Sequence, residues 1–373
     1  MADDDLDGGV LLLNFRGLSV LPAYLTKTRN YGNIKRLYLK RNLLTSLPAN
    51  ISNLCNLVEL YICDNDLSSL PDAIGDLKCL VSLNVDSNKL EKLPDSIDGL
   101  TALRTLSLAR NKFRFVPSKI WQLPNLRVLD LTGNDLRRIS LNISHTGNAP
   151  VKRPLERLVL DRNRLEVLPR QICALDSLQE ISAVGNCLRC IPLDLGYLKN
   201  LGSVLVDGNR TLNVVPISLT AQKLGINGCA RTKDSTCDNS MPHEFSSVFV
   251  PTKNDDTDEL VHLPEEILCI GNSTNFAVVT LLELALRSVF LNFRSAVNTR
   301  CLPRNLLEVL SVPTASCISC GTPIFTMCFP VVFGGQLHDK YGVYRLGLCC
   351  TVKCNRLCPI RIQMPLVYPV DKS

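Results

Sequence analysis

Two pairs of closely spaced cysteines near the C-terminus carry the clearest chemistry in the sequence. Cys317 and Cys320 form a C-x-x-C pair followed directly by Gly321, and Cys350 and Cys354 form a second pair about thirty residues later. Four thiolates in two such pairs satisfy the tetrahedral preference of Zn²⁺, and four protein ligands leave no open position for catalysis. The sequence therefore predicts one structural zinc ion bound by these four cysteines.

The segment between the two cysteine pairs leaves part of this prediction open. Cys349 and Cys350 are adjacent, so either could supply the third ligand. Residues 324–349 indicate strands around a Gly-Gly turn, and a module this small needs a metal to fold. The order of cysteine pair, hairpin and cysteine pair resembles a treble-clef finger. The alternative is that these thiols, like Cys328 and Cys358, are small apolar residues of a β core.

An amphipathic pattern precedes the cysteine-rich segment. In residues 280–290, TLLELALRSVF, one helical stripe contains Leu281, Ala285 and Val289 at positions i, i+4 and i+8. Residues 301–310, CLPRNLLEVL, predict a second short helix that Pro303 can open. The stripes of the two helices either bind another protein or pack around a small core of their own.

A 23-residue repeat organises the chain before these helices. Residues 36–57 contain regularly spaced leucines around Asn42, followed by a proline anchor at Pro48. The anchor recurs, mostly every 23 residues, at Pro22, Pro48, Pro71, Pro94, Pro117, Ser140, Pro169, Pro192 and Pro216. This pattern predicts an α/β fold, a leucine-rich repeat solenoid or horseshoe of about nine repeats of 23 residues.

Side chains between the strand leucines should face outward on the concave side, because side chains alternate across a strand. Stacked tyrosines beside arginines favour protein binding, since both side chains are frequent in interaction hot spots. The alternative is that these residues only solvate an open sheet face. The predicted binding residues are Arg36, Tyr38, Arg41, Tyr61, Arg104 and Arg110.

Composition and charge exclude several classes of function. The net charge of +6 is modest, and the basic residues are not interleaved with aromatic ones, which argues against nucleic-acid binding. No apolar run reaches the length of about 18 residues that a membrane span needs. No nucleophile with a base, phosphate-binding glycine loop or carboxylate pair indicates an enzyme. The pair Cys187 and Cys190 lacks a partner pair and does not indicate a metal site.

The N-terminus and the cysteine content predict a cytoplasmic protein. The opening residues, MADDDLDGG, are acidic, the reverse of a secretory signal, so the 17 cysteines are read as thiols or metal ligands. The predicted organisation is a flexible tail (1–9), a leucine-rich repeat domain (10–228), a linker or irregular insertion (229–260), a helical segment (261–312) and a zinc module (313–373).

The helical segment resembles a SOCS box, a module whose first helix docks into Elongin C and whose Leu-Pro element selects a cullin. The resemblance implies that Leu281 enters the Elongin C pocket, that Ala285 lies at the close helix contact and that Val289 supports it. Leu302, Pro303, Leu306 and Leu310 match the cullin-selecting part. This sequence departs from the pattern in having Ala at the small position and a single Leu-Pro.

Over nearly its whole length the chain resembles the leucine-rich repeat-containing protein twenty-eight family, and more distantly family fifty-eight of the same series. The resemblance rests on RLYLKRNLLTSLPANI, DRNRLEVLPRQICALDSL, LPRNLLEVL and the cysteine pairs. The more distant resemblance, to family fifty-eight, implies a substrate receptor for a cullin–RING ubiquitin ligase. We therefore predict a non-catalytic adaptor that binds a target on its concave face and docks to Elongin B/C and a cullin. The alternatives are a Ras-pathway signalling scaffold, which the plain 23-residue repeats also resemble, and a repeat protein whose C-terminal module only caps the core.

Overall fold

The computed structural model describes most of the repeat region and parts of the C-terminal region. The described residues are 6–7, 9–22, 25, 33–141, 153–220, 223–229, 247–251, 258–264, 267–270, 279, 281–293, 309–310, 312–333, 344–350, 354 and 368–369. Within these ranges no helix has the length and apolar character needed to cross a bilayer.

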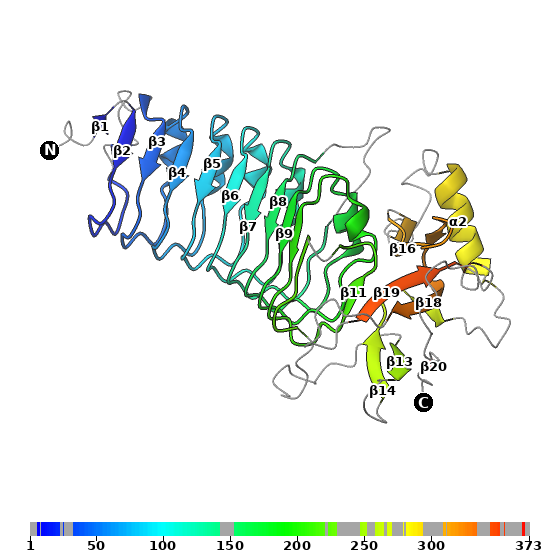
Figure 1. Ribbon diagram of the computed structural model, residues 1–373. Helices are drawn as coiled ribbons and strands as arrows, with labels where there is room; N and C mark the ends of the chain where they lie inside the picture. Colours follow the sequence, from blue (N-terminus) through cyan, green and yellow to red (C-terminus); the bar gives the residue numbers. More distant parts are fainter. Residues whose placement is uncertain are drawn as a thin grey trace. The chain divides into compact units, whose positions relative to one another are not determined.

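Each repeat contributes one very short strand to a single sheet (Figure 1). Ten strands run parallel, and β1 (Leu6–Asp7) is added antiparallel at one edge. The core leucines pair at the same position in successive strands, as Leu37 does with Leu60 and Leu60 with Leu83. The parallel strands are β2 (Val10–Leu12), β3 (Arg36–Tyr38), β4 (Glu59–Tyr61), β5 (Ser82–Asn84), β6 (Thr105–Ser107), β7 (Val128–Asp130), β8 (Arg157–Val159), β9 (Glu180–Ser182), β10 (Ser203–Leu205) and β12 (Leu224–Gly225). The leucine-rich repeat solenoid predicted from the sequence is confirmed.

After six of the described strands the chain returns through a short 3-10 helix, which begins directly after the repeat proline in five of these six cases. These prolines are the N-cap residues, and their carbonyls accept the first hydrogen bond of the helix, as Pro48 does from the Ile51 N–H at 3.1 Å. An isoleucine in these five helices is buried, for example Ile51 and Ile74. The helices are η2 (Ala49–Asn53), η3 (Asp72–Asp76), η4 (Asp95–Gly99), η5 (Ser118–Gln122), η6 (Arg170–Ala174) and η7 (Leu195–Tyr197).

A ladder of buried asparagines joins neighbouring repeats. The side-chain amide of Asn88 donates to the carbonyl oxygens of Ile62, in the preceding repeat, at 2.9 Å and Val85 at 3.0 Å. Its Oδ1 accepts the backbone N–H of Leu67 at 2.9 Å. Since the turn after each strand leaves these backbone groups without ladder partners, the asparagine satisfies them inside the core. The same pattern recurs at Asn65, Asn111, Asn134 and Asn163.

The described contacts divide the chain into two compact units. The first comprises residues 1–142, 152–164 and 177–185, and the second comprises residues 143–151, 165–176 and 186–373. The second unit therefore contains the last repeats together with the C-terminal strands and helix. The five-part organisation predicted from the sequence stays a prediction.

The second unit holds the remaining elements. Its largest additional sheet has the order β11, β19, β18, β15. The elements are β11 (Val214–Pro216), β13 (Ser247–Pro251), β14 (Asp258–His262), β15 (Cys269–Ile270), α2 (Leu281–Phe293), β16 (Ala315–Ser316), β17 (Pro323–Ile324), β18 (Met327–Phe333), β19 (Tyr344–Cys349) and β20 (Tyr368–Pro369).

Two segments differ from the sequence interpretation. Strands β13 and β14 form an antiparallel pair that begins within residues 229–260, predicted from the sequence to be a linker or irregular insertion, and ends at His262. The apolar residues in SVFVP and DELVH suit paired strands. The average composition of residues 229–260 is nevertheless polar, so composition alone does not indicate these strands. Strand β1 lies within the predicted flexible tail, because Leu6 and Asp7 pair with the first parallel strand.

We expect Asn88→Ala to lower the free energy of unfolding by about 1–3 kcal/mol, because buried backbone groups of two repeats lose their partners. Urea unfolding followed by circular dichroism measures this change. Asn125→Ala is the matched control, since Asn125 is exposed and its side chain donates one hydrogen bond, to the Thr101 carbonyl. Equal costs for the two variants would contradict the structural role of the ladder.

Candidate metal centre and docking helix

A tight turn positions the first cysteine pair. Cys317 follows β16, and its backbone N–H donates to the Thr322 carbonyl at 2.9 Å while Gly321 N–H donates back to the Cys317 carbonyl at 2.9 Å. Gly321 has φ 72°, a left-handed conformation that glycine adopts without steric cost. The turn joins β16 to its antiparallel partner β17, so the C-x-x-C pair lies at the tip of a two-stranded hairpin.

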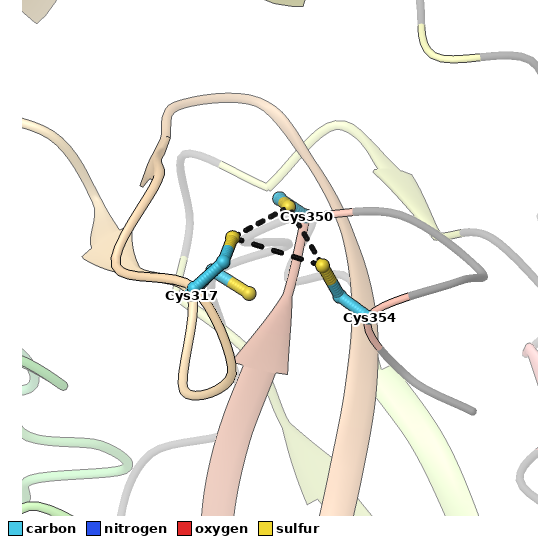
Figure 2. A group of neighbouring side chains, drawn as sticks. Cys317, Cys350 and Cys354 are labelled. Carbon is cyan, nitrogen blue, oxygen red and sulfur yellow. Dashed lines mark hydrogen bonds between the residues drawn. The ribbon is translucent and has the colours of Figure 1, made fainter. Parts of the chain in front are cut away.

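The side chains of the second cysteine pair lie beside those of the first (Figure 2). Cys350 follows directly after β19, and Cys354 lies four residues further on. The Sγ atoms of Cys317, Cys320, Cys350 and Cys354 all lie within 4.8 Å of one another. The distances are 3.4 Å from Cys320 to Cys350, 3.6 Å from Cys350 to Cys354 and 3.7 Å from Cys354 to Cys320.

These distances fit a tetrahedral metal site. Zinc–sulfur bonds of about 2.3 Å in a tetrahedron place the sulfur atoms about 3.8 Å apart. A disulfide would need about 2.05 Å, and all four cysteines are free thiols. The cluster could therefore bind one metal ion, and it contains the four residues named from the sequence.

Hydrogen bonds already favour the charged form of one ligand. The Cys349 side chain and the backbone N–H groups of Cys320, Ser319 and Cys350 lower the pKa of the Cys317 thiol. Burial raises the pKa of the Cys350 thiol, because a thiolate without a neighbouring cation is costly there. Cys349 is fully buried in the apolar core of this unit, and its neighbour Cys350 lies in the sulfur cluster.

Helix α2 faces its own chain with both polar and apolar side chains: Glu283, Arg287 and Leu286 are buried, and Phe290 stacks edge to face on Phe325 with ring centroids 5.6 Å apart. The carboxylate of Glu283 has no exposed surface, and Glu283 Oε1 lies 2.8 Å from Arg287 Nε. Glu283 also accepts the backbone N–H groups of Phe325 at 3.0 Å and Thr326 at 2.6 Å. A guanidinium nitrogen of Arg287 donates to the carbonyl of Cys350 at 3.4 Å. The inner face of α2 is thus bonded to the residues directly after β17 and to Cys350.

The opposite face of α2 is apolar and exposed. Leu281 is 86% exposed, Leu291 is 62% exposed and Ala285 is exposed, while Val289 is half-buried. Leu281 and Ala285 are two of the three docking residues predicted on this helix. The predicted cullin-selecting residues Leu302, Pro303 and Leu306 lie outside the described residues, and Leu310 is helical and half-buried.

The cysteine-containing strands also bond to the last repeats inside the second unit. Strand β19 pairs in parallel with β11, and Ile217 N–H donates to the Leu346 carbonyl at 3.0 Å. Asp194 accepts the backbone N–H and the hydroxyl of Ser316, both at 2.8 Å. Burial raises the pKa of Asp194, and the two Ser316 hydrogen bonds oppose this shift. In the sequence, the only sign of this contact is Asp194 itself. A polar residue in the return segment of a repeat does not by itself indicate a contact with a distant segment.

The predicted target-binding residues lie at two places in the first unit. Tyr38 and Tyr61 stack edge to face with ring centroids 5.1 Å apart, on β3 and β4. Arg36 and Arg41 lie beside them and pair with Glu59 and Asp64, each at 3.6 Å. Arg104 and Arg110 lie before and after β6 and are exposed. Leu12 and Phe15 were not among the predicted binding residues. Leu12 pairs in register with Tyr38, and Phe15 lies beside Arg41, so both lie next to the predicted residues.

A comparison with protein-family models supports the repeat assignment for part of the chain. The model of the leucine-rich repeat region matches residues 11–142. A leucine-rich repeat protein of Leptospira interrogans is 29% identical with a TM-score of 0.48, over 57% of this chain and 59% of that chain. The plant peptide hormone receptor RGFR1 in complex with RGF2 is 23% identical with a TM-score of 0.44, over 56% of this chain and 38% of the receptor. The chain spans less than two thirds of the length of either protein. The family match and the observed strands identify residues 11–142 as a leucine-rich repeat region, and the concave faces of such regions are commonly binding surfaces.

We expect the purified protein to contain about one zinc ion per chain, as a four-cysteine site requires. The double variant Cys317→Ser with Cys350→Ser should lose the metal, measured by plasma emission spectroscopy after gel filtration. Cys55→Ser with Cys79→Ser, which changes two exposed thiols in the repeats, should keep it. An unchanged zinc content in the first variant would exclude the cluster as the binding site.

We expect Glu283→Ala to lower the free energy of unfolding by about 3–5 kcal/mol, because it leaves the Arg287 guanidinium buried without its partner. Leu282→Ala, an exposed position on the same helix, should change it by less than about 0.5 kcal/mol. Chemical denaturation of the full chain measures both values. The anchoring role of Glu283 fails if the two variants are equally stable.

Proposed function

We propose that this protein is a non-catalytic adaptor that binds a target protein through its leucine-rich repeats and docks to a ubiquitin ligase through α2. The observation that carries the proposal is the inverted amphipathicity of α2. Its charged residues Glu283 and Arg287 are buried against its own chain together with Leu286, and its other four leucines, Leu281, Leu282, Leu284 and Leu291, are exposed. An amphipathic helix normally buries its apolar stripe, so this arrangement favours a second polypeptide as the partner of the apolar face.

The energetics of the two faces support this interpretation. The Glu283 carboxylate has four hydrogen-bonding partners in its own chain, so the inner face is satisfied without help from outside. On the outer face, full burial of Leu281 by a partner would contribute about 1.5–3 kcal/mol. Leu284 and Leu291, which are also exposed, would add to it.

Elongin C is the partner that the sequence resemblance supports. Leu281 and Ala285 occupy the pocket-entering and close-contact positions of a SOCS box helix, and both are exposed. Val289, at the supporting position, is half-buried. In this proposal Elongin B/C and a cullin bring a separate transferase to the target, and this chain contributes proximity alone.

A structural zinc ion in the four-cysteine cluster is part of the proposal. When bound, it would connect the β16–β17 turn to the segment after β19. The supporting observations are the sulfur distances and the contacts of Glu283 and Arg287 to the residues directly after β17 and to Cys350. Because such a thiolate cluster needs reduced cysteines, we place the protein in the cytoplasm.

Binding of purified Elongin B/C to the full chain tests the adaptor proposal. We expect Leu281→Asp to weaken binding by at least tenfold, because the charge would be buried at the interface. Leu268→Asp is the matched control, since Leu268 is 64% exposed in the same unit but lies outside α2, and it should bind normally. Biolayer interferometry measures both affinities.

The proposal fails if the wild-type chain shows no affinity for Elongin B/C, or if both variants lose the same affinity. The first result would favour the signalling scaffold or a module that only caps the repeats. A point variant is preferable to removal of residues 261–373, because β19 and Ser316 bond to the last repeats and their removal would expose apolar core.

A further inference from the structure

One end of the open sheet face, on β2 to β4, carries exposed apolar residues that the core does not use. Leu12 is 51% exposed and Phe15 is 63% exposed. Leu12 pairs in register with Tyr38, and Tyr38 with Tyr61, so the three side chains form one column across neighbouring strands. We call Leu12, Phe15, Tyr38, Arg41 and Tyr61 the aromatic patch.

Phe15 occupies a backbone conformation that is unfavourable for it. Its φ is 59°, in the left-handed region, where a bulky side chain costs roughly 1–2 kcal/mol. Later repeats place polar residues or glycine at the matching position, for example Asp64, Ser87 and Gly133. An exposed aromatic residue in strained backbone adds little to the core, and strain of this kind points to a binding role.

The patch is held rigid before any partner arrives. The Tyr38 hydroxyl donates to Glu59 Oε2 at 2.7 Å, and this bond and burial raise the Tyr38 pKa to about 12. The Ser82 hydroxyl donates to the Tyr61 oxygen at 3.2 Å. The Arg41 guanidinium lies 5.5 Å from the centre of the Phe15 ring. Fixed aromatic side chains lose little conformational entropy when they bind.

The charges around the patch are predominantly basic. Arg41 within the patch and Lys35, Arg36 and Lys40 beside it are exposed. Arg36 and Arg41 pair with Glu59 and Asp64, whereas Lys35 and Lys40 form no salt bridge to a residue that the structure describes. A partner with carboxylates beside its apolar residues is therefore complementary.

We propose that the aromatic patch binds a protein segment in which aliphatic or aromatic residues are flanked by aspartate or glutamate. This inference deepens the proposed function, since it assigns the chemistry of the target and the place where it binds. It does not depend on α2, whose partner is a different one.

Fluorescence polarisation with four sets of synthetic twelve-residue peptides tests the inference on the full chain. The sets carry Leu/Phe pairs flanked by Asp/Glu, the same pairs flanked by Lys/Arg, Ala pairs flanked by Asp/Glu, and Ala pairs flanked by Lys/Arg. We expect the acidic–apolar set alone to bind, and to bind more weakly as the salt concentration rises.

Phe15→Asn separates binding from folding. Asparagine tolerates the left-handed conformation, so the midpoint of thermal unfolding should stay unchanged or rise while peptide affinity falls at least tenfold. Phe115→Asn removes another exposed phenylalanine outside the patch and should keep the affinity. Tyr38→Phe, which keeps the ring, should bind within about threefold of wild type, whereas Tyr38→Ala should lose at least tenfold.

The inference is overturned if no set binds selectively, if the basic set binds best, or if Phe115→Asn loses as much affinity as Phe15→Asn. A dimer that dissociates in Phe15→Asn, seen by light scattering, would also overturn it by showing that a second copy covers the patch. Leu281→Asp should keep peptide binding, so failure of the Elongin proposal and failure of this inference give different results.

Discussion

The placement of α2 depends on one buried carboxylate. Glu283 accepts two backbone N–H groups and pairs with Arg287, and these bonds turn the polar side of the helix inward. Since a charge this deeply buried is tolerated only with such partners, the helix cannot rotate to bury its four exposed leucines instead. The exposed apolar face is therefore a consequence of satisfied polar groups on the opposite side.

The same physical constraint acts in the repeats on a larger scale. Each buried asparagine satisfies backbone groups of its own repeat and of a neighbouring one, and the leucines stack in register above it. The residues between the leucines are therefore not needed to fill the core. The open sheet face can thus carry the proposed binding residues Tyr38 and Tyr61 outside the core.

Periodic features of this protein were predictable from its sequence, and contacts between distant segments were not. The 23-residue spacing predicted the repeats because the strand and turn of each repeat are determined by its own residues and by the adjacent repeats. The cysteine spacings identified the members of the sulfur cluster because a metal site imposes a local geometry. The stripe Leu281, Ala285 and Val289 predicted a helix, but which face it buries depends on Phe325 and Thr326, more than forty residues away.

The pairing of β11 with β19 and the bonds from Asp194 to Ser316 escaped prediction for the same reason. Strand β19 reads as a local hairpin strand, and nothing in its residues indicates a partner in a repeat. The exposed Phe15 escaped because a repeat pattern specifies buried positions and does not reveal a positive φ. Contacts and strain of this kind follow from the folded arrangement of the chain as a whole.

Photo-crosslinking from position 281 tests the central claim of this account most directly. A benzoylphenylalanine replacing Leu281 in the full chain, mixed with purified Elongin B/C and irradiated, should form a covalent adduct with Elongin C that mass spectrometry maps to this position. Crosslinks from position 281 to residues of its own chain alone would contradict the account, because the apolar face of α2 would then be covered from within.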